Sequence, residues 1–258
     1  MSSPVLVTGG TGRLGRRAVR RLRDAGCDVR VLTRHSREAT DGIQFLTGDL
    51  RSGEGVDAAV DGVAAVVHCA TSTKGDVEAT RHLVQAASRA GSPHLVYVSI
   101  VGVDHLSTWG YPKAKLQAER VVADSGLPWT ILRATQFYDY VLAGLRKLAR
   151  LPVPAGFLVQ PIDPDEVAAR LVELTLGEPA GRVPDMGGPQ VISWADLLRG
   201  YLRTTHRHRW LVPIRIPGTG AVRAGGLLPS PEHATGHRTW EQFLSTRLRR
   251  HDGSLDTP

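Results

Sequence analysis

The stretch Val5-Leu6-Val7-Thr8-Gly9-Gly10-Thr11-Gly12-Arg13-Leu14-Gly15 decides the fold of this chain. An apolar run meets a cluster of glycines, and a helical pattern follows over residues 14–25. In such a strand–loop–helix unit, Gly9 permits the tight turn, Gly12 lets the backbone approach a phosphate, and Gly15 lets the helix pack close to the sheet. The helix N-terminus offers free N–H groups and a positive dipole end to an anion. The stretch therefore predicts a dinucleotide-binding loop rather than a purely structural glycine turn.

Arginines follow the second predicted strand, residues 28–32. In this kind of unit an acidic residue about twenty positions past the glycines binds the ribose 2′-OH of NAD, whereas an arginine there accommodates the 2′-phosphate of NADP. Arg34 stands at the strand end, Arg37 comes soon after, and the first acid is Glu38. A guanidinium binds a phosphate bidentately and a carboxylate repels it. The sequence therefore favours NADP(H) over NAD(H), and within the loop Arg13 is expected to touch a ligand phosphate.

Further apolar runs and helical patterns alternate along the chain, which predicts an α/β fold with a parallel, doubly wound sheet. Strands are expected at 43–46, 63–68, 95–99 and 129–133, and helices at 76–90, 112–125, 138–148, 163–176, 193–201 and 238–249. Beyond Gln136 the pattern loosens, but the segment is too apolar to be a tail. We therefore expect a dinucleotide-binding core over 1–137 and a small mixed lobe over 138–258 that closes a substrate pocket, the two forming one integrated domain.

Composition narrows the class of protein. The chain has 258 residues, a formal net charge of +7 and two cysteines, Cys27 and Cys69, without CxxC spacing, so we expect free thiols in a reducing compartment. The arginines are scattered, which indicates a solvated surface rather than a nucleic-acid footprint. No signal segment or membrane span is visible, which favours a cytoplasmic protein without a membrane partner. His206 and His208 lack a third ligand at suitable spacing, and no metal site is expected.

Ser99, Tyr111 and Lys115 form the second informative group. Ser99 ends a predicted strand, and the YxxxK spacing places Tyr111 and Lys115 on one helix face. An ammonium group near a phenol lowers its pKa from about 10 toward neutrality, so a tyrosine placed in this way can act as general acid toward a carbonyl. Ser99 would hydrogen-bond the developing alkoxide. The alternative is a surface tyrosine at a helix start beside a solvated lysine.

Four stretches together resemble the atypical short-chain dehydrogenase/reductases and, more narrowly, the NmrA-like NAD(P)H-binding proteins; they are 8–15, 97–103, 115–119 and 129–137. The resemblance covers nearly the whole chain and implies a Rossmann fold. It also implies that Lys115 contacts the nicotinamide ribose and that Arg34 binds the 2′-phosphate. The other implied contacts are Thr8, Gly9, Gly10, Thr11, Gly12, Arg13, Leu14 and Gly15 at the pyrophosphate, Asp49 and Leu50 at the adenine, Ala70 and Thr71 on the ribose side, and Ala134, Thr135, Gln136 and Phe137 beside the nicotinamide. From the residues alone, Asp49 could equally cap the turn that follows it.

These observations predict an NADP(H)-dependent oxidoreductase that reduces a carbonyl, quinone or activated double bond of a small, mainly apolar substrate. Two alternatives stay open. One is a cofactor-binding redox sensor of the NmrA-like type that catalyses nothing, and the other is an epimerase or dehydratase acting on a nucleotide sugar. The protein is expected to be a monomer or a homodimer.

Overall fold

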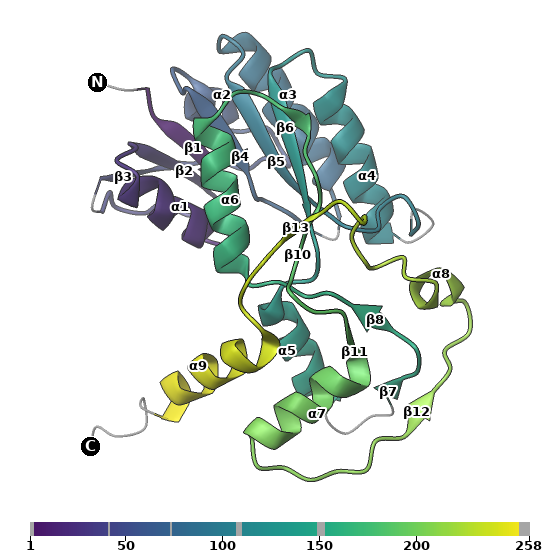
Figure 1. Cartoon of the computed structure of the whole chain (residues 1–258). Coiled ribbons are helices and arrows are strands. Elements are labelled where there is room, and N and C mark those ends of the chain that lie inside the picture. The colour runs from purple at the N-terminus through teal and green to yellow at the C-terminus, as the bar shows by residue number, and fades with distance from the viewer. Residues whose placement is uncertain (1–2, 41, 73, 107–109, 149–152, 253–258) are drawn as a thin grey trace. The chain divides into compact units, whose positions relative to one another are not determined.

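The computed structural model describes residues 3–40, 42–72, 74–106, 110–148 and 153–252 (Figure 1). The chain forms two compact units. The first comprises Met1–Arg133 and Pro164–Pro184, and the second comprises Ala134–Asp163 and Asp185–Pro258. Among the described residues, every helix is too short or too polar to cross a membrane.

A parallel sheet forms the centre of the first unit. Its strands are β1 (Val5–Thr8), β2 (Val29–Thr33), β3 (Ile43–Thr47), β4 (Ala65–His68), β5 (His94–Ile100), β6 (Trp129–Ala134, whose last residue lies in the second unit) and β9 (Gly181–Arg182). The strand order is β3-β2-β1-β4-β5-β6, and β9 pairs with β6. Thr8 of β1 pairs with Leu32 on one side and His68 on the other, both in parallel register. The order reverses between β1 and β4, and such a switch point is where doubly wound folds bind their ligands.

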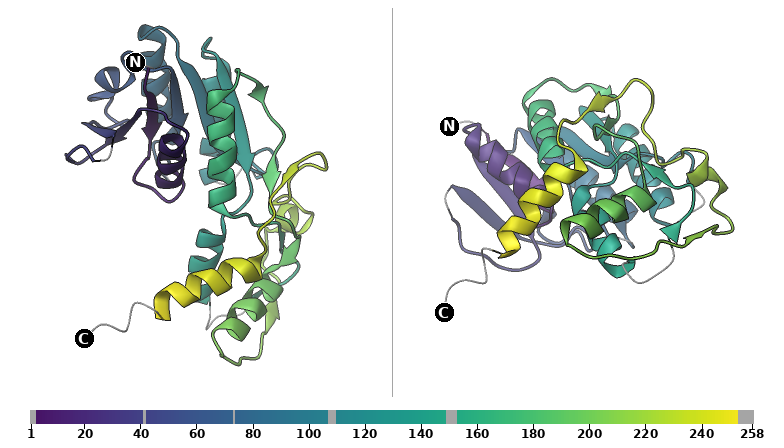
Figure 2. Two further views of the ribbon diagram at one scale, coloured as in Figure 1. Left: turned by 60° about the vertical axis from the view of Figure 1, so that its left-hand side comes forward. Right: turned by 60° about the horizontal axis from the view of Figure 1, so that its bottom comes forward.

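Helices cover both faces of this sheet (Figures 1 and 2). On one face lie α1 (Gly15–Asp24) and α6 (Pro164–Leu176), and on the other lie α2 (Val56–Val60), α3 (Asp76–Arg89) and α4 (Gly110–Ala123). Helix α1 buries Ala18, Val19 and Leu22, which share one face because Leu22 follows Ala18 by four residues and Val19 by three. The helix ends before Gly26, whose φ of +81° is the left-handed conformation that commonly follows a helix. The predicted doubly wound α/β fold is therefore confirmed.

A buried ion pair joins strand β6 to helix α4. The Arg133 guanidinium donates to both carboxylate oxygens of Glu119, at 2.9 and 2.6 Å, and to Asp104 at 2.5 Å. Arg133 and Glu119 are 5% and 6% exposed, so both charges lie inside the packed unit. Two parallel N–H···O bonds give this pair a fixed geometry, which orients α4 and the residues it carries.

The second unit has its own core. Its elements are α5 (Tyr138–Leu148), β7 (Val153–Pro154), β8 (Leu158–Val159), β10 (Met186–Gly187), β11 (Ile192–Ser193), α7 (Trp194–Thr204), β12 (Pro213–Ile214), α8 (Gly220–Arg223), β13 (Ala234–Thr235) and α9 (Trp240–Asp252). Trp240 is fully buried and stacks on Phe243, and α9 packs beside α7 (Figure 2). The Ser193 side chain accepts from the Asp196 N–H and caps the N-terminus of α7.

Candidate cofactor and catalytic site

The glycine loop lies where β1 and β4 end. Gly9 has a φ of +66°, and a Cβ atom there would lie 2.6 Å from the backbone nitrogen of Ala70. The N–H of Gly12 donates to the Gly9 carbonyl at 2.8 Å and closes the turn. A Cβ on Gly12 would meet nothing within 4 Å except that carbonyl oxygen, at 3.1 Å. The loop backbone is thus packed on the side of β4 and accessible at Gly12, which fits the close approach of a pyrophosphate.

The sequence predicts close packing at Gly15, and the structure shows that Gly10 is closely packed as well. A Cβ atom on Gly10 would lie 2.7 Å from a side-chain carbon of Val31 on β2. At Gly15 the added atom would collide with the backbone of Gly9 and Gly10, so the first turn of α1 packs directly against the loop. Both glycines therefore fix the position of the helix N-terminus relative to the sheet.

Thr8 holds a buried histidine beside this loop. Its hydroxyl lies 2.7 Å from Nδ1 of His68, and Nε2 of His68 lies 3.2 Å from the Thr80 hydroxyl. Thr80 donates its single hydroxyl proton to the carbonyl of Asp76, so Nε2 is the ring nitrogen that carries the proton and Nδ1 accepts from Thr8. Burial, and then the nearby Lys115 ammonium, lower the pKa of His68 from 6.5 to about 3. His68 is therefore a neutral bridge between β1, β4 and α3.

Arginines gather around a cavity of about 480 Å³ that is also lined by Gly10 and Thr11 of the loop. Its cationic lining residues are Arg16, Arg20, Arg23 and Arg37. Arg34 and Arg13 are exposed in the first unit. Arg17 points elsewhere, because its Nε donates to Asp165 of α6 at 3.0 Å. Asp24 also lines the cavity, but the four arginines leave it with a net positive charge, which suits a phosphate group.

Asp49, which follows β3, caps the turn that comes after it. Oδ1 of Asp49 accepts from the Arg51 N–H at 2.9 Å, which is the turn-capping arrangement considered from the sequence. Leu50 is buried, and its carbonyl lies 2.8 Å from Nδ1 of His82. The adenine contact of Asp49 and Leu50 stays a prediction.

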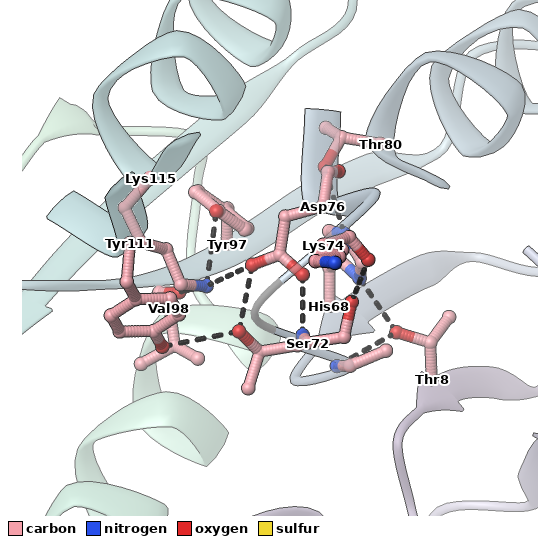
Figure 3. Close-up of polar contacts among 12 residues, drawn as sticks. Thr8, His68, Ser72, Lys74, Asp76, Thr80, Tyr97, Val98, Tyr111 and Lys115 are labelled. Atoms are coloured by element: carbon pink, nitrogen blue, oxygen red, sulfur yellow. Dashed lines mark hydrogen bonds and ion pairs between the residues drawn. The ribbon is translucent and has the colours of Figure 1, made fainter. Parts of the chain in front are cut away.

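Ser99, Tyr111 and Lys115 lie in the same unit, on β5 and α4. Ser99 is 3% exposed, and its Oγ has no hydrogen-bond partner among the described residues. Lys115 is 2% exposed, so it is not the solvated lysine of the alternative interpretation. Its ammonium donates to the Tyr97 hydroxyl at 3.1 Å and the Val98 carbonyl at 3.3 Å (Figure 3). The buried Ser99 hydroxyl is costly without a hydrogen-bond partner, and a substrate oxygen would provide one.

Asp76 is the residue of this region that the sequence did not single out. At the first turn of α3 it appeared only as a helix start, and helical periodicity carries no sign of what its carboxylate faces. In the structure Oδ2 accepts from the Thr71 hydroxyl at 2.7 Å and lies 3.6 Å from the Lys115 ammonium (Figure 3). Thr71 in turn lies 3.1 Å from the Tyr111 hydroxyl. The two residues of the YxxxK pair are therefore linked through Thr71 and Asp76.

The segment expected beside the nicotinamide belongs to the second unit. Ala134 pairs with Met186, and the Thr135 hydroxyl donates to the Gln160 carbonyl at 2.6 Å. Nε2 of Gln136 donates to the Leu227 carbonyl at 3.3 Å, and Phe137 stacks on Tyr140. These contacts fix the segment within its own unit, and its role toward the cofactor stays a prediction.

Comparison with known proteins identifies the family of this chain. Residues 9–175 match the family described as NAD(P)H-binding. The chain is 33% identical to the (4-alkanoyl-5-oxo-2,5-dihydrofuran-3-yl)methyl phosphate reductase of Streptomyces griseus, over 97% of this chain and 88% of that protein. It is 29% identical to the NAD(P)H azoreductase of Xenophilus azovorans, over 75% and 71% of the two chains.

Among solved structures, the NADPH-dependent quinone oxidoreductase of Escherichia coli, complexed with NADPH, has the same fold. Its TM-score is 0.79 at 18% sequence identity, with 95% of this chain and 99% of that chain covered. The chain therefore belongs to the NAD(P)H-binding family, in the NmrA-like class of atypical short-chain dehydrogenase/reductases that its motifs predict. It is an NAD(P)H-dependent oxidoreductase.

Proposed function

We propose that this protein uses NADPH to reduce a carbonyl, quinone or activated double bond of a small, mainly apolar substrate. The observation that carries the proposal is the buried Lys115 ammonium in the same unit as the unpartnered hydroxyl of Ser99 and the accessible backbone at Gly12. The name of the Streptomyces griseus relative supports the activated double bond, since a 5-oxo-2,5-dihydrofuran carries a carbon–carbon double bond conjugated to its carbonyl. We further propose that the segment 138–258 selects the substrate.

In the proposed reaction NADPH supplies the hydride, and the protein supplies position and a proton. The loop at Gly9 to Gly15 would hold the pyrophosphate with backbone N–H groups and the N-terminus of α1. Lys115 would bind the nicotinamide ribose and contribute positive charge. Ser99 would donate to the substrate oxygen as negative charge develops on it, and Tyr111 would deliver the proton.

The preference for NADPH over NADH is part of this proposal. It is supported by Arg34 at the end of β2 and by the four arginines that line the cavity beside the loop, of which Arg37 comes from the segment after β2. We expect NADPH to raise the melting temperature more than NADH at equal concentration, because a ligand that binds only the folded state stabilises it by mass action. The variants Arg34→Ser and Arg37→Ser should narrow the difference between the two cofactors.

The proposal is tested by following NADPH oxidation with a panel of quinones, ketones and acylated butenolides. Tyr111→Phe should lower kcat by about 10²–10⁴-fold, the usual contribution of a general acid. Lys115→Met should lower kcat as well, whereas Lys113→Met, an exposed lysine on the same helix, should leave it unchanged. Unaltered turnover in Tyr111→Phe and Lys115→Met would show that the mechanism is wrong. NADPH binding without turnover of any substrate would favour the redox-sensor alternative.

A further inference from the structure

Asp76 is almost completely buried, and both of its carboxylate oxygens accept hydrogen bonds. The side chain is 5% exposed at the first turn of α3. Oδ1 accepts from the Ser72 N–H at 2.5 Å, and Oδ2 accepts from the Thr71 hydroxyl at 2.7 Å and faces Lys115 at 3.6 Å (Figure 3). A carboxylate placed in this way costs several kcal/mol of desolvation unless its partners offset that cost. Its burial therefore requires Thr71, Ser72 and Lys115 to stay where they are.

The contact between Thr71 and Asp76 sets the direction of the next hydrogen bond. A threonine hydroxyl carries one proton, and that of Thr71 is donated to Asp76. The hydroxyl of Tyr111, 3.1 Å from the Thr71 oxygen, must then be the donor in their contact. In the substrate-free protein the phenol proton is thus directed toward Thr71, and rotation about the phenol C–O bond would turn it toward a substrate oxygen when Tyr111 acts as the acid.

Lys115 depends on Asp76 for its charge balance. Burial lowers the pKa of Lys115, and Asp76 is the strongest of the groups that raise it again. Glu119 also faces the ammonium from its own helix, but it is held bidentately by Arg133. The titratable groups around Lys115 are Asp76 on α3, Cys69 after β4, His68 on β4, Tyr97 on β5 and Glu119 on α4. Among these described groups, Asp76 is the acid that forms an ion pair with the ammonium.

We propose that Asp76 is a positioning residue, which holds the Lys115 ammonium directly and orients the Tyr111 hydroxyl through Thr71. The proposal rests on the proposed reductase function, because it assigns Asp76 to the pair that would act there. In this role Asp76 would act through Thr71 and Lys115 and not on the substrate itself. It connects the helix that carries Tyr111 and Lys115 to the segment after β4, so that the acid and the cation are fixed by one carboxylate.

The first test measures Lys115 without any substrate. The rate at which an amine-reactive reagent labels Lys115 is followed by mass spectrometry as a function of pH, in the wild type and in Asp76→Asn. Asparagine keeps the shape but removes the charge, so the ammonium loses its counter-ion and should give up its proton at a pH lower by one unit or more, about the effect of a nearby opposite charge. Glu78→Gln, an exposed acid on the same helix, is the control and should leave the profile in place.

The second test addresses Thr71, which is exposed and so tolerates substitution. Thr71→Val removes the hydroxyl, and Thr71→Ser restores it. We expect Thr71→Val to shift the ring resonances of Tyr111 in the substrate-free protein and to lower kcat, while the Lys115 labelling profile stays unchanged. Thr71→Ser should recover both. In the Asp76→Asn background, Thr71→Val should add little, because the two residues act through one contact.

For the reductase reaction, the alkaline limb of the kcat/KM profile should move to lower pH in Asp76→Asn. It should keep its position in Thr71→Val. An Asp76→Asn protein with the wild-type Lys115 labelling profile would overturn the proposal, as would fully additive effects of the two substitutions. If the labelling and the ring resonances shift as expected but no variant reduces any substrate, the positioning role of Asp76 stands and the reductase function fails.

Discussion

A methyl group added at Gly9 would violate two constraints that act on the glycine loop. The first is conformational, since a φ of +66° costs a residue other than glycine about 1–2 kcal/mol. The second is steric, since the new Cβ would lie 2.6 Å and 2.7 Å from the backbone nitrogen and Cα of Ala70. Backbone cannot move aside as a side chain can, and overpacking of this kind costs about 1–3 kcal/mol. Gly9→Ala should therefore lower the free energy of unfolding by about 2–5 kcal/mol.

Two other glycines supply the controls. Gly26 has a φ of +81°, and a Cβ there would meet nothing within 4 Å, so Gly26→Ala carries only the conformational cost. Gly12→Ala adds a methyl group whose single close neighbour is the Gly9 oxygen at 3.1 Å, and its stability should change by less than about 1 kcal/mol. That methyl group stands on the accessible side of the loop. Gly12→Ala should therefore weaken NADPH binding at least about tenfold, or about 1.4 kcal/mol.

The assay combines hydrogen exchange of the β1 and β4 amides, which reports on opening of the first unit, with titration of NADPH. Gly26→Ala should bind NADPH as the wild type does, and Gly9→Ala should lose both stability and affinity. Equal losses of stability in Gly9→Ala and Gly26→Ala would refute the steric argument, because the loop would then have moved away from Ala70 without cost. Unchanged NADPH affinity in Gly12→Ala would show that the pyrophosphate does not approach the loop there.

Three further predictions follow from buried groups. Trp240→Ala should lower the stability of the second unit by about 3–5 kcal/mol in thermal unfolding, whereas Trp210→Ala, at a side chain 93% exposed, should leave it unchanged. Glu119→Ala should cost about 3 kcal/mol in denaturant unfolding because it leaves the Arg133 guanidinium poorly paired, and a matched apolar pair at both positions should recover the loss. Because His68 has a folded pKa of about 3 and an unfolded value near 6.5, stability should fall by up to about 1.4 kcal/mol per pH unit as the pH drops through that window. His68→Gln should flatten this slope, and an unchanged slope would contradict the assignment.

The sequence predicted the α/β core well because its signals there are local. The glycine loop and the helical pattern over residues 14–25 follow from residues close together in the chain. Five residues of regular structure, as in α2, are too few to show a helical period, and this helix was not predicted. The short strands of the second unit were not predicted either, because two residues cannot display an alternation of exposed and buried side chains.

The polar contacts of the site could not be predicted, because their partners are far apart in sequence. Asp165 stands in the first turn of α6, and it pairs with Arg17, 148 positions earlier. The YxxxK spacing puts Lys115 on the helix face of Tyr111, but the sequence gives no sign that Asp76 pairs with the Lys115 ammonium. A spacing such as YxxxK fixes which residues share a helix face. The burial of that face, and the charge opposite it, depend on the packing of α3 against α4.

The glycine loop and Tyr111 of the candidate catalytic pair both contact one short segment after β4. Ala70 lies against Gly9, and the next residue, Thr71, bonds Asp76 and contacts Tyr111. The segment 69–71 thus contacts both the glycine loop and Tyr111. A side chain at position 9 would meet the backbone of Ala70, and a residue without a hydroxyl at position 71 would lose the hydrogen bond to Asp76. The segment after His68 is therefore subject to two separate constraints, close backbone packing against the loop and hydrogen bonding of Thr71 to α3 and α4.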